Sequence, residues 1–173
     1  GDVILLSGSV GDHGVAIMSS REHLEFETEL KSDSAALNGL VARMVEAVPD
    51  IHCMRDPTRG GLATTLNELA AQSGVGMQIV EEQIPVKPDV AAACELLGLD
   101  PLYIANEGKL IAICPEKHAE PLLAVMREDE LGRDASIIGR VVADEHRFVQ
   151  MQTNFGGSRI VDWLAGEQLP RIC

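Results

Sequence analysis

Apolar residues recur along the chain with the spacing of helices in several places. Between residues 34 and 48 they return every three or four positions, which predicts a helix with one buried face. Ser34 suits its N-cap, and Pro49 ends it. Pro88 suits the first turn of an alanine-rich helix that we expect to reach Leu97. The remaining helices are expected in a short stretch ending near residue 20 and over residues 61–72 and 115–127.

Short apolar runs bounded by turn residues predict the strands. We expect them over residues 3–6, 51–54, 76–80, 102–105, 109–114, 136–142 and 147–152. Asn106, Glu107 and Gly108 separate two of these runs and suit the positive φ of a tight hairpin, which places Glu107 at its tip. The last two runs predict a second strand pair. Because hairpins interrupt the alternation of helices and strands, we expect an α+β fold, a mixed sheet layered with helices.

The charge of the chain excludes several classes of function. It carries 27 Asp and Glu against 14 Lys and Arg, for a formal net charge of −13, and such a surface repels the phosphates of nucleic acid. Its apolar runs, such as residues 3–6 and 90–93, are far shorter than the roughly 20 residues that a membrane span needs. We therefore expect neither a nucleic acid nor a membrane as partner.

The four cysteines are widely spaced and form neither a disulfide pattern nor a zinc motif, which favours a cytoplasmic protein. Cys53, Cys94 and Cys114 lie among apolar residues and are expected in the core. Cys173 ends the chain, after a predicted mobile tail of residues 164–173 that follows a domain of residues 1–163. The start at Gly1, without a Met or a polar leader, indicates a piece of a longer protein.

The segment from Asp56 to Gly61 is the richest in candidate chemistry, because it places a carboxylate and a hydroxyl beside two glycines where a helix begins. Free backbone N–H groups there favour an anion such as phosphate, and Asp56 could hold Mg²⁺ against that phosphate. The alternative interpretation is that Asp56 or Thr58 caps the helix, while Gly60 and Gly61 turn the chain.

Cys173 and Glu107 are the other candidates. A thiol at a free chain end could carry a chemical group into a site and out again, or it could be idle. Glu107 could act as a general base if its turn faces a pocket, or it could be a solvated turn residue. His13 and His52 flank the glycine-rich and Asp-Pro-Thr segments, and a histidine in such a place is more often a packed or capping residue than an acid or base.

Several segments together resemble the HypE family, the carbamoyl dehydratases of nickel-iron hydrogenase maturation. They are SGSVGDHG at 7–14, MRDPTRGGL at 54–62, ANEGK at 105–109 and the terminal PRIC at 170–173. The Asp-x-Thr-x-Gly-Gly pattern is shared with a wider superfamily that includes aminoimidazole ribonucleotide synthetase, selenophosphate synthetase and thiamine-phosphate kinase. The Pro-Arg-Ile-Cys ending is specific to the dehydratases. The resemblance implies a fold like the C-terminal domain of that superfamily, partly ferredoxin-like.

The resemblance also implies roles for residues and partners. Cys173 would receive a carbamoyl group from a partner carbamoyltransferase, ATP would drive its dehydration to an S-cyanate, and Glu107 would accept a proton. Asp56, Thr58, Gly60 and Gly61 would contribute to a Mg-ATP site, with Asp56 on the metal. The cyano group would pass to iron on a hydrogenase maturation scaffold complex.

Members of the HypE family are about twice as long, with an N-terminal domain for ATP binding and homodimer formation that this chain lacks. Two alternatives remain open at this point. One is another phosphate-transfer enzyme of the superfamily, similar to selenophosphate synthetase. The other is a non-catalytic docking module that recruits maturation partners through its acidic surface.

Overall fold

The computed structural model describes residues 1–21 and 31–164 of the chain. Within these residues, seven strands form one mixed sheet in the order β2-β4-β1-β5-β3-β6-β7. They are β1 (Val3–Leu6), β2 (Cys53–Arg55), β3 (Gly76–Val80), β4 (Ile111–Cys114), β5 (Ser136–Val142), β6 (Val149–Gln152) and β7 (Ser158–Ile160). Neighbouring strands are antiparallel, apart from the parallel pair β3 and β6.

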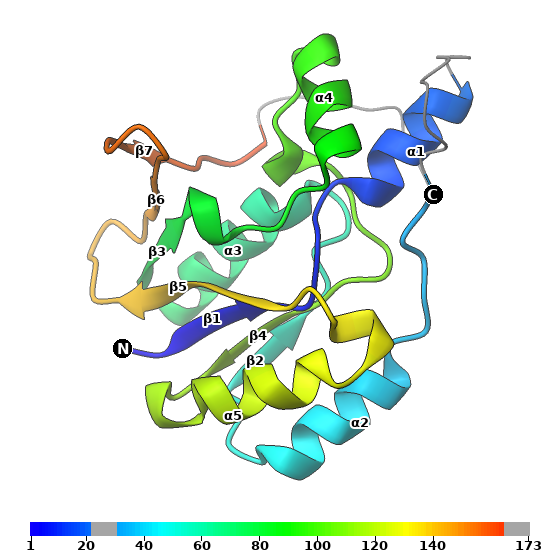
Figure 1. The fold of residues 1–173 in the computed structure, drawn as a ribbon. Coiled ribbons are helices and arrows are strands. Elements are labelled where there is room, and N and C mark those ends of the chain that lie inside the picture. Colours follow the sequence, from blue (N-terminus) through cyan, green and yellow to red (C-terminus); the bar gives the residue numbers. More distant parts are fainter. Residues whose placement is uncertain (22–30, 165–173) are drawn as a thin grey trace.

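The described helices are α1 (Asp12–Arg21), α2 (Asn38–Ala47), α3 (Gly61–Ser73), α4 (Pro88–Leu97) and α5 (Glu116–Arg127), with short 3-10 helices η1 (Glu81–Gln83), η2 (Pro101–Tyr103) and η3 (Glu130–Gly132). Helix α3 packs on one face of this sheet and α2 and α5 on the other, while α1 and α4 pack against each other beside it (Figure 1). None of the helices in the described part of the chain is long and apolar enough to cross a membrane. The α+β class with a mixed, helix-layered sheet is therefore confirmed.

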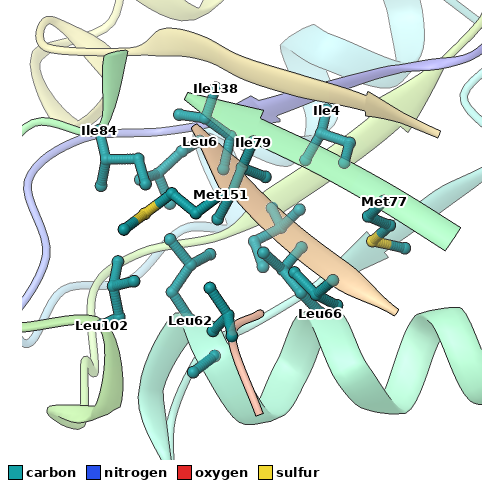
Figure 2. Packing of buried hydrophobic residues seen from close by; sticks show 14 of the residues in the cluster. Ile4, Leu6, Leu62, Leu66, Met77, Ile79, Ile84, Leu102, Ile138 and Met151 are labelled. Atoms are coloured by element: carbon teal, nitrogen blue, oxygen red, sulfur yellow. The ribbon is translucent and has the colours of Figure 1, made fainter. Parts of the chain in front are cut away.

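The central strand β1 is buried on both faces because successive side chains of a strand point to opposite sides of the sheet. Ile4 and Leu6 pack with Leu62 of α3 in one apolar cluster, shown in Figure 2. Val3 and Leu5 point the other way, into a second cluster that includes residues of α2 and α5. The result is a three-layer core, with α3 on one side of the sheet and the α2–α5 pair on the other (Figure 1).

A third apolar cluster joins α1 and α4 and contains Val15, Val90 and Ile104. Ile104 belongs to the loop between η2 and β4, which is also the loop that carries Glu107. This cluster therefore anchors that loop to the two helices.

Two predicted strand pairings are wrong. Residues 102–105 form no strand, because Pro101 fixes its own φ and the Asp100 side chain accepts a hydrogen bond of 3.0 Å from the N–H of Leu102, which starts the 3-10 helix η2. The runs at 136–142 and 147–152 are strands but do not pair with each other, because β3 lies between β5 and β6. The order of strands in a sheet depends on contacts between segments far apart in the chain, and the local sequence pattern does not predict these contacts.

Among the other differences, α2 begins later than predicted, the strands β2, β4 and β6 differ from their predicted bounds by one or two residues, and one strand was not predicted. Helix α2 begins at Asn38, four residues after the predicted cap; the N–H of Ser34 bonds to the Ser32 hydroxyl at 3.1 Å, and residues 31–36 belong to no helix or strand. Strand β7 was not predicted, since Ser158–Ile160 is short and largely exposed.

We predict that Gly61→Ala destabilises the fold more than Gly74→Ala, although both glycines have positive φ, 63° and 68°, at the two ends of α3. A Cβ at Gly61 would lie 2.5 Å from the carbonyl oxygen of Leu102 and 2.6 Å from that of Ile104, whereas a Cβ at Gly74 would meet nothing within 4 Å. Gly74→Ala should cost about 1–2 kcal/mol from φ alone, and Gly61→Ala about 1–3 kcal/mol more. Urea denaturation measures both, and equal losses would contradict this packing.

Candidate functional site

The motif segments meet at one edge of the sheet for a topological reason. Strands β1 and β2 both run antiparallel to β4, so their C-terminal ends lie where β4 begins. The chain that leaves β1 is residues 7–14, the chain that leaves β2 is the turn of residues 56–61, and the chain that enters β4 is residues 104–110. The N–H of Ser7 bonds to the carbonyl oxygen of Leu110 at 3.0 Å, which holds the first and third segments side by side.

The buried side chain of Asn106 connects all three segments. Its Oδ1 accepts a hydrogen bond of 2.8 Å from the N–H of Gly11. Its Nδ2 donates to the carbonyl oxygen of Pro57 at 2.9 Å and to that of Ile104 at 3.0 Å. The backbone N–H of Asn106 also donates to the Pro57 oxygen, at 3.2 Å. The neighbouring Glu107 is thereby held beside the Asp56–Gly61 turn.

The start of α3 fits an anion. The N-cap is Gly60, with φ of 75°, and no side chain caps the helix, so the interpretation of Asp56 or Thr58 as the cap is wrong. Thr64, in the first turn, has a buried Oγ1 without a hydrogen-bond partner among the described residues, and a Cβ on Gly60 would overlap this atom. An uncapped helix start, a bare glycine and a spare hydroxyl are groups that a phosphate can use.

Asp56 is open to solvent, with a side chain that is 62% exposed, and its Oδ1 lies 3.9 Å from Nε of Arg55. Among the described residues, no group of three or more His, Cys, Asp or Glu side chains lies close enough to hold a metal ion. Asp56 can therefore serve only as one ligand of a shared ion. This is compatible with Mg²⁺, which keeps several waters and is bound through one or two carboxylates and the phosphates of a substrate.

Glu107 is exposed but is not at the tip of a hairpin, as the sequence predicted. It lies in the loop between η2 and β4, because the residues before it form no strand. The structure thus brings Glu107 and the Asp56–Gly61 turn to the same edge of the sheet through Asn106.

Asp33 is a site residue that sequence reasoning missed. Its carboxylate accepts a hydrogen bond of 3.2 Å from the backbone N–H of Glu107 and forms an ion pair of 3.0 Å with Nζ of Lys109. The two segments are more than seventy residues apart, and no periodicity links them. In the sequence, only the polar run Lys31 to Asp33, which lies outside any predicted element, pointed to a functional segment.

The cysteines separate into two groups. Burial raises the pKa of the Cys94 thiol to about 11, and burial also raises the pKa of the Cys53 and Cys114 thiols. Cys94 and Cys114 are buried and Cys53 is half-buried, so these three are poor nucleophiles near neutral pH, as expected of core residues. Cys173 lies outside the described residues.

The two histidines singled out from the sequence make local contacts. Nδ1 of His13 lies 2.8 Å from the hydroxyl of Ser32. Nδ1 of His52 lies 2.7 Å from Oδ2 of Asp2, and this hydrogen bond raises the pKa of His52. The contact between His52 and Asp2 links the segment before β2 to the segment before β1.

The chain is similar to proteins of one family along its whole length. Residues 1–152 match the model of the C-terminal domain of AIR synthase related proteins. The chain is 72% identical over 173 residues to the carbamoyl dehydratase HypE of Azotobacter vinelandii, and it covers 100% of itself and 51% of that protein. It therefore spans about half the length of the curated relatives that it matches.

Solved structures agree. A crystal structure of the hydrogenase maturation protein HypE in complex with ATP is 52% identical, with a TM-score of 0.94, and the match covers 100% of this chain and 53% of that one. The HypE chain of a HypE–HypF complex is 47% identical, with a TM-score of 0.91, over 95% and 53% of the two chains. The chain belongs to the AIR synthase related proteins, matches their C-terminal domain, and has carbamoyl dehydratases HypE as its relatives in that family.

Proposed function

We propose that the full-length protein containing this chain is an ATP-dependent carbamoyl dehydratase that turns an S-carbamoyl group on Cys173 into an S-cyanate. The observation that carries the proposal is the Asn106 contact, which joins the loop of Glu107 to the Pro57 carbonyl in the glycine turn. A base and a phosphate-binding turn held at one place are what this reaction needs. The names of the relatives support the same activity.

The glycine turn is proposed to bind the phosphates of Mg-ATP. The N–H groups at the start of α3 and the hydroxyls of Thr58 and Thr64 are suitable donors. Gly60 and Gly61 are proposed to contribute through their backbone, because the space that a side chain would occupy at each of them is filled by neighbouring atoms of the protein. Asp56 is the proposed ligand of Mg²⁺. The ATP complex of a HypE structure supports nucleotide binding by this family. When bound, ATP supplies the phosphoryl group that makes the carbamoyl oxygen a leaving group.

The role of the chain's own residues follows from the balance of the reaction. The S-carbamoyl group, S–C(=O)–NH₂, must lose its oxygen and two N–H protons to become S–C≡N, and the oxygen leaves as phosphate. Glu107 is proposed to take one of these protons. An exposed carboxylate next to a rigid backbone anchor can reach a group brought in by a chain end, and proximity then lowers the barrier.

The partners follow from the same chemistry. The thiol of Cys173 needs a donor of the carbamoyl group, and we propose that a carbamoyltransferase supplies it. The HypE–HypF complex among the similar structures supports a protein partner for this step, and we propose HypF as the carbamoyltransferase. The cyano group is proposed to go to an iron-carrying maturation scaffold complex. A homodimer in the full-length form and a cytoplasmic location complete the proposal.

We predict that Cys173 is the residue that accepts the carbamoyl group. Incubation of the full-length protein with the carbamoyltransferase and carbamoyl phosphate should add one carbamoyl group to the last peptide, as measured by mass spectrometry. Cys173→Ala should abolish the modification, while Cys53→Ala should keep it, because the raised pKa of Cys53 makes that thiol a poor nucleophile. A modification that persists in Cys173→Ala would contradict the assignment.

We predict that Glu107→Gln accepts the carbamoyl group at the normal rate but dehydrates it at least about 100-fold more slowly, because a general base typically contributes that much or more. The S-carbamoyl and S-cyanate forms are followed by mass spectrometry after addition of ATP. Glu120→Gln makes the same change at an exposed glutamate of α5 and should leave the rates of carbamoyl loading and dehydration unchanged. A docking module would show no effect of either substitution.

A further inference from the structure

Asp33 occupies a position that an ordinary surface carboxylate would not. Its side chain is 2% exposed, and that of its ion-pair partner Lys109 is 13% exposed. Oδ2 of Asp33 pairs with Nζ of Lys109, and Oδ1 accepts the hydrogen bond from the N–H of Glu107. One buried carboxylate thus binds the residue proposed as the base and the residue two positions after it.

The backbone around Asp33 lies directly on the Glu107 loop. A Cβ on Gly108 would overlap the carbonyl oxygen of Asp33 and lie 3.1 Å from the N–H nitrogen of Ala35, so this approach requires glycine. The stem of Lys109 in turn lies against Gly8, where a Cβ would be 3.0 Å from Cε of the lysine. The segment that contains Asp33 therefore covers the Glu107 loop on one side, while the hydrogen bonds of Asn106 hold the loop on the buried side.

The energetic cost of this arrangement indicates a purpose beyond stability. A buried ion pair gains little over apolar residues of the same volume, because both charges must first lose their water. The feature that an apolar pair would not reproduce here is the acceptor that Asp33 offers to the N–H of Glu107. That hydrogen bond restrains the backbone from which the Glu107 side chain projects.

We propose that Asp33 is a positioning residue for Glu107: its buried carboxylate, neutralised by Lys109, fixes the backbone of the general base during dehydration. This inference rests on the proposed function of Glu107. It assigns Asp33 no contact with the substrate and no proton transfer, and it assigns Lys109 the role of counter-ion.

Charge-neutral double variants of the full-length protein test the proposal. Asp33→Asn/Lys109→Met keeps an acceptor for the N–H of Glu107, whereas Asp33→Leu/Lys109→Met has nearly the same shape without an acceptor. Both remove the two charges together, so neither leaves an unpaired buried charge. We expect the Leu variant to lower kcat for dehydration about tenfold or more while the Asn variant stays near wild type, since small displacements of a catalytic group have effects of this size.

Four further measurements make the result decisive. Carbamoyl loading of Cys173 and KM for ATP should be unchanged in both variants, and circular dichroism and thermal unfolding confirm that both fold. If the Leu variant fails to fold, Asp33→Ala/Lys109→Met replaces it in the same comparison with the Asn variant. Equal kcat values for the variants with and without the acceptor, whether both are near wild type or both are lowered, would overturn the proposal.

Glu107→Gln, measured alongside, separates the two levels of inference. If Glu107→Gln dehydrates normally, the proposed function of Glu107 fails. If Glu107→Gln is inactive while the Leu and Asn variants at Asp33 are equally active, only the positioning role of Asp33 fails.

Discussion

The amide of Asn106 is the interaction on which the site depends. Loops cannot be placed by local preference, and three of them must meet here without an element of secondary structure between them. One amide offers two donors and an acceptor, which suits the carbonyl oxygens of Pro57 and Ile104 and the N–H of Gly11. Loss of these bonds would leave several buried polar groups unsatisfied, so the amide is as much a part of the core as the leucines of β1.

Glycines complete what the amide begins. Gly61 allows α3 to start against the carbonyl oxygens of Leu102 and Ile104, and Gly108 allows the segment of Asp33 to lie on the next turn of the chain. Each glycine replaces a side chain by a backbone contact, so the segments around the Glu107 loop lie closer together. The candidate site is held together by backbone contacts, while the side chains of Asp56 and Glu107 are exposed.

The charged side chains of the molecule fall into an exposed group and a buried, paired group. The excess of acidic residues is carried mainly by solvated side chains, whereas the site contains a carboxylate, Asp33, that is buried and paired. Burial also keeps the thiols of Cys53, Cys94 and Cys114 protonated, so the described part of the chain offers no competitor for a reactive cysteine. The three described thiols are therefore poor nucleophiles, which is compatible with the carrier role proposed for Cys173.

The sequence by itself determined the elements and the chemistry of the motifs. Helical spacing found α2, α4 and α5, turn residues found the start of α3, and Asp56 and Glu107 were recognisable from motifs of a few adjacent residues. These features depend on neighbours in the chain, and so local pattern is sufficient. The tertiary structure decided the strand order, the position of Glu107 in a loop and the contacts of Asp33, because each depends on hydrogen bonds between segments far apart in the chain. Periodicity predicts which face of an element is buried, but it does not predict which distant segments contact that face, and only the tertiary structure shows these contacts.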